Sequence, residues 1–219
     1  MSYLRDTAFV LRQEPFRDYD GWITLYGKTH GKLEGVARGM YRPSSKQRGH
    51  LEPLTCVEVM IAKGQAFDKV AVVQSLAPRP QTRTQLGSVV FASHVASLTD
   101  RLTREGQPDE QVFAVLESAL VFANTLPNDV TPTRVDMMYL AIAYRLMSEL
   151  GFVTIEGEED EQLRKIFRFF SVARIEDIAR LTISRDLLEK MDAMMNVWER
   201  EHALMGAEWG TRAPSRFLV

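Results

Sequence analysis

The sequence predicts an α+β protein of two domains, a five-stranded N-terminal β-barrel over residues 1–78 and an all-α domain over residues 79–219. Two observations support this division. Up to about residue 76, short runs of β-branched and aromatic residues alternate with turn residues, as is typical of strands. After Pro78 and Pro80, which can continue neither a strand ladder nor a helix, the apolar residues recur at helical spacing.

The barrel is expected to contain strands over residues 7–12, 21–26, 32–38, 55–61 and 69–75. Tight turns are predicted at 18–21, 29–31 and 63–65, where glycine is present, and the longest gap runs from 39 to 54. Five short strands are too few for an up-and-down barrel and fit an OB-type Greek-key barrel, whose sheet face and loops bind single strands. An SH3-like barrel has a similar strand period, which does not separate the two.

Six helices are expected in the second domain. They cover residues 84–104, a segment that begins at Pro108, and residues 132–150, 161–170, 175–181 and 184–205. Thr133 and Asp136 have the spacing of a capping box near the start of the third helix, and Gly151 follows its end. Residues 209–219, which include Pro214, are expected to be irregular.

Composition limits the classes of function. The net charge is −2, but residues 1–83 hold 13 Lys and Arg against 8 Asp and Glu, whereas the remainder holds 14 against 21. This asymmetry indicates that the N-terminal part of the protein faces a polyanion. Apolar stretches are interrupted by charge and the N-terminus has no signal-peptide core, so a cytoplasmic protein without a membrane segment is expected. A single cysteine and scattered histidines predict neither a disulfide nor a metal site.

Gly27-Lys28-Thr29 resembles the end of an ATP-binding P-loop. The motif requires a glycine where this chain has Trp22, and it requires a helix where a strand is expected from Lys32 onward. Both requirements fail. The sequence therefore predicts a β-turn here and no nucleotide cofactor.

Cations are concentrated around this turn. On the strand that follows it, the period of two places Lys32, Glu34 and Arg38 on one face, and the next loop adds further cations together with Tyr41. Such residues contact phosphates without reading bases, so a nucleic-acid backbone is the expected ligand. The alternative is a solvated loop. The candidate DNA-binding residues are Lys32, Arg38, Arg42, Lys46 and Arg48, with Lys28, His30 and Tyr41 as further candidates.

No catalytic residues are predicted, and the protein is expected not to be an enzyme. The acids of residues 156–161 precede a helix and resemble a solvated turn. Cys56 and the Met191, Met194 and Met195 series are expected in the core, although the methionines could also form a groove for the apolar face of a partner peptide.

Several stretches resemble the RecO family of bacterial recombination mediators. They are TAFVLR, THGKLEGVARG and RPSSKQRGHLEP in the first domain, and LTDRLTREGQPDEQVFAVLESAL, YRLMSELGF and RAPSRFL beyond it. Their order and spacing extend over nearly the whole chain. Many family members carry a four-cysteine zinc module after the central helix, whereas ELGFVTIEGEEDEQLRK has no cysteine, which resembles the zinc-free branch.

The resemblance implies an OB-fold domain followed by a helical domain, and a role in recombinational DNA repair through the RecF pathway. It implies binding of single- and double-stranded DNA, annealing of complementary strands, and help in loading RecA on DNA coated by single-strand binding protein. The implied partners are RecR and the C-terminal tail of single-strand binding protein. The tail pocket is expected to be apolar and ringed by cations, for which Arg134, Arg145 and Arg164 are candidates. The alternative is a protein-protein adaptor that does not contact DNA.

Overall fold

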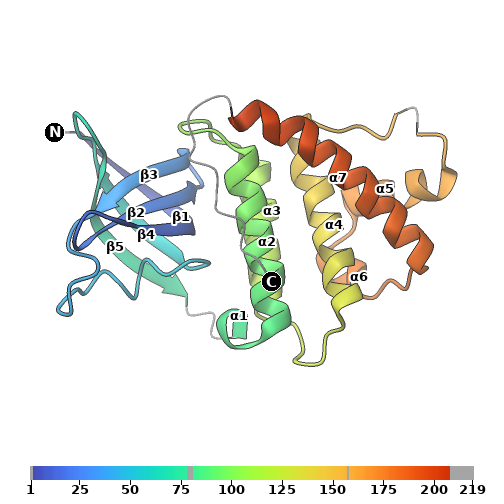
Figure 1. The fold of residues 1–219 in the computed structure, drawn as a ribbon, viewed down its shortest axis with the longest axis horizontal. Coiled ribbons are helices and arrows are strands. Elements are labelled where there is room, and N and C mark those ends of the chain that lie inside the picture. Colours follow the sequence, from blue (N-terminus) through green and yellow to red (C-terminus); the bar gives the residue numbers. More distant parts are fainter. Residues whose placement is uncertain (1, 78–80, 157, 208–219) are drawn as a thin grey trace.

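The computed structural model describes residues 2–77, 81–156 and 158–207. All strands lie in the first of these ranges, and the helices lie beside the barrel in the other two (Figure 1). The predicted domain boundary at residue 78 and the predicted irregular tail over residues 209–219 lie outside the described residues. Within those ranges, no helix combines the length and the apolar character needed to cross a membrane.

The five strands are β1 (Tyr3–Phe16), β2 (Asp20–Gly27), β3 (Gly31–Ala37), β4 (Cys56–Ala62) and β5 (Lys69–Ala77). They form a closed barrel in the order β1-β2-β3-β5-β4, and β1 also pairs with β4. All neighbours are antiparallel except β3 and β5. The OB-fold barrel is confirmed.

Strand β1 is longer than its sequence pattern predicts because it pairs on both edges. Tyr3 to Phe9 lie opposite β4, whereas Ala8 to Phe16 lie opposite β2, with a register shift between Val10 and Arg12. Each half of the strand therefore hydrogen-bonds to a different partner, and both ends of the run are ordered by the barrel.

Strand β1 is also apolar on both faces. Ala8 and Val10 belong to the core of the barrel, whereas Phe9 and Leu11 belong to the core of the helical domain. The Phe9 ring lies 5.5 Å from the ring of Phe113. A strand that is covered on both sides is a nearly continuous apolar run, which explains the AFVL sequence of residues 8–11.

The helices are α1 (Gln81–Thr84), α2 (Leu86–Leu102), α3 (Glu110–Ala123), α4 (Pro132–Glu149), α5 (Glu161–Val172), α6 (Ile175–Ile178) and α7 (Arg185–Ala207). Helices α2 and α3 lie nearest to the barrel, and α4, α5 and α7 lie beyond them (Figure 1). Asp109 and Asp160 cap α3 and α5 by accepting hydrogen bonds from main-chain N–H groups of the first turn.

The capping box predicted at Thr133 and Asp136 is wrong. Helix α4 has Thr131 at its N-cap and Pro132 as its first residue, and the Thr131 side chain makes no capping hydrogen bond. Proline is suited to the first helical position because its φ is fixed and it lacks the N–H that would be unpaired there. Thr133 therefore lies inside the helix and cannot act as its cap.

The core predictions for single residues are confirmed. Cys56 is buried, and Met191 and Met195 are buried in the helical core, with Met194 packed against it.

The hairpin between β2 and β3 contacts the loop between α2 and α3. Gly31 has a φ of +67°, and a Cβ there would lie 2.3 Å from the main-chain oxygen of Gln107. The N–H of Gly106 donates a 3.0 Å hydrogen bond to the carbonyl of Lys32. Glycine is needed at position 31 both for the left-handed backbone and for this close approach.

Candidate nucleic-acid interface

The loop over residues 38–55 connects β3 to β4 and carries most of the predicted DNA-binding residues. Met40 and Leu51 are fully buried and belong to the barrel core. The Tyr41 N–H donates to the carbonyl of Tyr19, and the Gly39 N–H donates to the Asp20 carboxylate, at 2.9 and 2.8 Å. The loop is therefore fixed to the barrel, and specifically to the β1–β2 turn.

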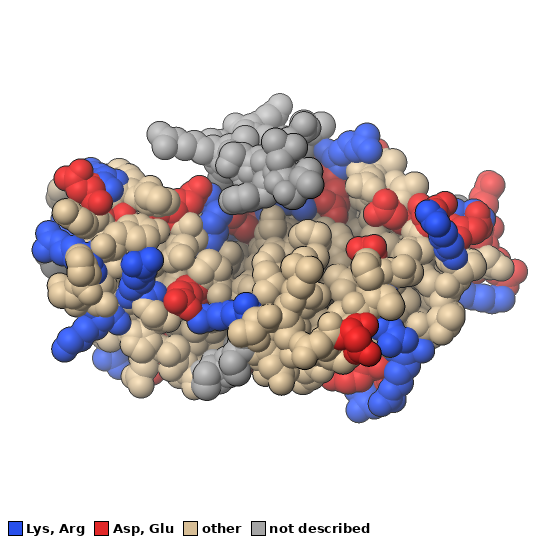
Figure 2. Space-filling view, turned by 60° about the horizontal axis from the view of Figure 1, so that its bottom comes forward, with Lys and Arg blue, Asp and Glu red and all other residues tan. Residues whose placement is uncertain are grey.

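The loop presents four cations to solvent: Arg38, Arg42, Lys46 and Arg48. Across the residues that the structure describes, none of the four forms an ion pair, whereas Arg12, Lys32 and Lys63 of the barrel do. Figure 2 shows lysine and arginine side chains spread over the barrel end of the molecule, with acidic residues among them. These charges are available to an external anion.

Two of the arginines lie over tyrosine rings. The Arg42 guanidinium is 5.7 Å from the centre of the Tyr19 ring, and that of Arg48 is 5.9 Å from the centre of the Tyr41 ring. A cation that lies over a ring keeps its N–H edge free for hydrogen bonding. Tyr41 is itself half-buried against the barrel core, so it supports Arg48 and is not a freely exposed stacking platform.

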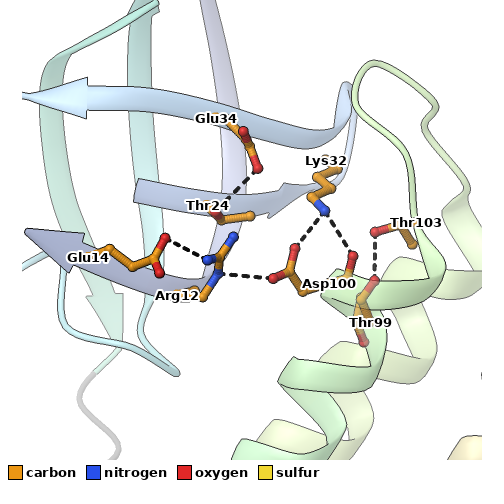
Figure 3. A network of polar contacts seen from close by, with 8 residues as sticks. All are labelled: Arg12, Glu14, Thr24, Lys32, Glu34, Thr99, Asp100 and Thr103. Atoms are coloured by element: carbon orange, nitrogen blue, oxygen red, sulfur yellow. Dashed lines mark hydrogen bonds and ion pairs between the residues drawn. The ribbon is translucent and has the colours of Figure 1, made fainter. Parts of the chain in front are cut away.

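Lys32 is placed elsewhere. Its ammonium lies 2.6 Å from the Asp100 carboxylate of α2, and only 6% of its side chain is exposed. Arg12 of β1 pairs with the same carboxylate at 3.1 Å, so Asp100 joins two strands to the helical domain (Figure 3). Lys32, which was expected to face DNA, contacts α2 instead. Lys32 is therefore not part of the exposed cationic surface.

Glu34 lies near this network on the same face of β3. Burial raises the pKa of the Glu34 carboxyl above its usual range, and the charge of Lys32 acts in the opposite direction. Thr24 donates to it at 3.5 Å.

Lys28 and His30 lie at the other end of β3 from the basic loop. A strand of this length separates the two ends by roughly 20 Å. Lys28 is exposed at the tip of the hairpin. His30 is held by Asp6, whose buried carboxylate accepts hydrogen bonds from the main-chain N–H groups of Thr29 and His30 and lies 3.0 Å from the His30 Nδ1. The turn that resembles a P-loop thus binds a carboxylate of its own chain.

Sequence reasoning missed Arg17. It occupies the β1–β2 turn with a φ of +57°, is exposed, and forms no ion pair with any residue that the structure describes. Its guanidinium lies 5.0 Å from the centre of the Phe16 ring. The signal that could have revealed it is a basic residue in a turn flanked by aromatics, in the sequence PFRDYDGW.

The candidate partner-binding arginines do not form a common site. Arg145 donates to the carbonyls of Phe170 and Ala173 at the end of α5, and burial lowers the pKa of its guanidinium. Arg134 is exposed at the start of α4, and Arg164 lies near the carbonyl of Glu158. Arg145 therefore has a structural role within the helical domain.

A groove of about 250 Å³ lies between α2, α4 and α7. Its polar lining is internally paired, because Glu199 accepts from both Arg101 and the Tyr139 hydroxyl at 2.9 and 2.8 Å. Asp192 adds a second acid. In the described residues this groove is therefore not ringed by unpaired cations. The same residues contain no group of three His, Cys, Asp or Glu side chains that could hold a metal ion.

The fold and this surface define a class of protein, an OB-fold barrel with an exposed cationic loop joined to a helical domain. The family model described as "Recombination protein O N terminal" matches residues 1–79. Residues 1–79 therefore form an N-terminal domain of the RecO family.

Similar curated proteins carry the same family name. The DNA repair protein RecO of Pelotomaculum thermopropionicum is 32% identical over 120 residues, which are 55% of this chain and 47% of that protein. The DNA repair protein RecO of Desulfitobacterium hafniense is 31% identical over 152 residues, which are 69% of this chain and 53% of that protein. The chain spans about half the length of these relatives.

Proposed function

We propose that this protein is a non-enzymatic DNA-binding mediator of recombinational DNA repair. The observation that carries the proposal is the set of four exposed cations on the loop after β3, none of which is paired with an acid of the described chain. The names of the similar proteins support the repair role. The basic loop supports the ligand, because unpaired arginine and lysine bind phosphate oxygens.

The loop is proposed to bind the backbone of single- and double-stranded DNA. Each phosphate contact releases condensed counterions, so binding should be strongest at low salt and weakly selective for sequence. Neutralising the phosphates of two complementary strands lowers the repulsion between them, which favours annealing without a source of chemical energy. The proposal includes no nucleotide, because the N–H groups of the turn at Thr29 and His30 already donate to the Asp6 carboxylate.

The test is charge reversal of Arg38 and Arg42 together, to glutamate. Both side chains are exposed, so the fold should tolerate the change. We expect at least a tenfold loss of affinity for single-stranded DNA at low salt, and a decrease of about two in the slope of log affinity against log salt. A matched control reverses Arg168 and Arg200, which are exposed on α5 and α7 and change the net charge equally. Equal affinity in the two double variants would reject the loop as the binding site.

The partners are proposed from the family. They are RecR, the C-terminal tail of single-strand binding protein and, indirectly, RecA, and the site of action is the cytoplasm, at the nucleoid. Annealing of complementary oligonucleotides should be measured with and without single-strand binding protein while the salt concentration is raised. Annealing at low salt supports the mediator. Binding of RecR or the tail peptide without any DNA binding would instead identify a protein-protein adaptor.

A further inference from the structure

Three aromatic side chains from separate segments meet at one end of the barrel. Phe16 ends β1, Trp22 lies in β2, and Phe67 lies in the loop between β4 and β5. Each pair of ring centres is 5.5 Å apart, and the planes are inclined by 59 to 87°. We call these three residues the aromatic cluster. Phe16 borders the β1–β2 turn and Phe67 lies in the β4–β5 loop, and these two connections bind oligonucleotides in OB-fold proteins.

The cluster is not closed over by the protein. The side chain of Phe67 is 39% exposed, and Phe16 and Trp22 are half-buried. Arg17 lies over two of the rings, with its guanidinium 5.0 Å from the centre of Phe16 and 6.0 Å from that of Phe67. A cluster that only stabilised the barrel would be expected to bury its rings, because exposed aromatic surface forgoes the hydrophobic gain.

A hollow of about 230 Å³ opens beside Trp22 and Phe67. The charged residues that line it are Glu34, Asp68, Glu105 and Lys63. The Lys63 ammonium is paired with the Asp68 carboxylate at 2.6 Å. Carboxylates repel the phosphates of a nucleic acid but accept hydrogen bonds from the N–H groups of an uncharged base. The hollow thus suits a base and disfavours a phosphate.

The loop over residues 38–55, called here the cationic loop, lies directly beside this site. Tyr41 of the loop donates to the carbonyl of Tyr19, two residues after Arg17, and Gly39 donates to Asp20 of the same turn. A strand whose phosphates contact the loop therefore has the aromatic cluster within reach of its bases. The carboxylates of the hollow repel phosphates and the loop cations attract them. A bound DNA strand would therefore turn its bases toward the hollow and its phosphates toward the loop.

We infer that the aromatic cluster is a stacking site for an unpaired base of single-stranded DNA, with the neighbouring backbone held by Arg17 and the cationic loop. This inference rests on the proposed function and adds a base-binding site to it. A ring offers a face to any base, so the site should be tolerant of sequence. Bases in a duplex are already stacked on one another, so the site should contribute to single-strand binding alone.

The experiment compares an intact oligonucleotide with an abasic one of equal length, which has the same phosphates but lacks the bases. Both are titrated against the wild-type protein and against Phe67→Ala, with Phe67→Tyr as the variant that retains the ring. Val72→Ala, which changes an exposed side chain of β5 outside the hollow, is the matched control. Thermal unfolding of each variant establishes that it is folded.

We expect the wild type and the Phe67→Tyr and Val72→Ala variants to bind the intact strand about tenfold more tightly than the abasic strand. In Phe67→Ala this preference should fall to near unity, with affinity for the abasic strand unchanged. Equal binding of both strands by the wild type would overturn the stacking site and leave phosphate binding by the loop intact. A preference for bases that survives in Phe67→Ala would also overturn it. Absence of binding to either strand would overturn the proposed function and this inference together.

Discussion

The Lys32 ammonium lies 2.6 Å from the Asp100 carboxylate and donates a 2.8 Å hydrogen bond to the Asp100 main-chain carbonyl. The contact joins β3 of the barrel to α2 of the helical domain (Figure 3). Because Asp100 also pairs with Arg12 of β1, one carboxylate neutralises two cations at the contact between the barrel and the helices.

Removal of Asp100 should destabilise the protein strongly. Asp100→Ala leaves Lys32 buried without its counter-charge, and the loss should be about 3 to 5 kcal/mol in the free energy of unfolding measured with urea. Lys32→Met should cost less, because Asp100 then keeps Arg12 as a partner. An equal or larger loss in Lys32→Met would contradict the network. Lys165→Met, which breaks an exposed pair with Glu161, is the control and should have little effect.

Gly31→Ala should be destabilising by about 2 kcal/mol or more. The substituted residue would have to keep a left-handed φ, and its Cβ would meet the main chain at Gln107. Gly49→Ala is the matched control, because Gly49 has no such φ and a Cβ there would meet nothing within 4 Å. Thermal or urea unfolding of the two variants gives the comparison. Similar stability in the two variants would show that the hairpin does not depend on the close contact between Gly31 and the main chain of Gln107.

Glu34→Gln should stabilise the protein at neutral pH, with an effect that disappears in acid. Burial raises the pKa of Glu34 in the folded state, so the folded protein binds this proton more tightly than the unfolded chain does. Stability contributed by the protonated group is fully present below the unfolded pKa and is lost as the pH rises through the folded pKa.

The measurement for Glu34 is urea unfolding of the wild type and the variant from about pH 4 to pH 7. The difference in the free energy of unfolding should grow with pH in favour of the variant. Glu58→Gln, at an exposed position of β4, should show no such growth. A constant difference across the range would contradict the assignment to Glu34.

Arg145→Met should loosen the end of α5. The guanidinium donates to the carbonyls of Phe170 and Ala173, which would lose their partners, and hydrogen bonds to a charged group contribute about 1.5 to 3 kcal/mol. Urea unfolding should show a loss of this order, and hydrogen exchange should accelerate at Val172 and its neighbours. Arg168→Met, at an exposed site on the same helix, is the control. An unchanged free energy of unfolding in Arg145→Met would contradict this structural role. Arg145 would then again be a candidate for the partner-binding site that the sequence suggested.

Much of the fold could be predicted from local pattern. All five strands and all the longer helices fall where alternation and helical spacing indicated, and most bounds differ by one to a few residues. The largest difference is at β1, whose extra residues are ordered by pairing with β4 at its beginning and with β2 at its end. Those pairings join residues far apart in the chain and leave no local period.

The candidate site could be predicted only in part. The loop residues Arg38, Arg42, Lys46 and Arg48 are exposed together as their concentration in the sequence indicated, and their role in DNA binding stays a prediction. Lys32 has the same charge and lies in the same charge run, yet it is buried. Arg17 and Phe67 are close in space and 50 positions apart in the chain, so no spacing rule could have joined them.

The sequence by itself determined the order of strands and helices, the position of the cationic loop and the core status of Cys56 and the methionines, because these follow from periodicity, turn residues and local charge. Only the tertiary structure decided which face of β3 meets the helical domain. That choice depends on a counter-charge at Asp100, 68 residues away in the chain. Strand period can divide side chains between two faces, but it cannot say which face water will reach.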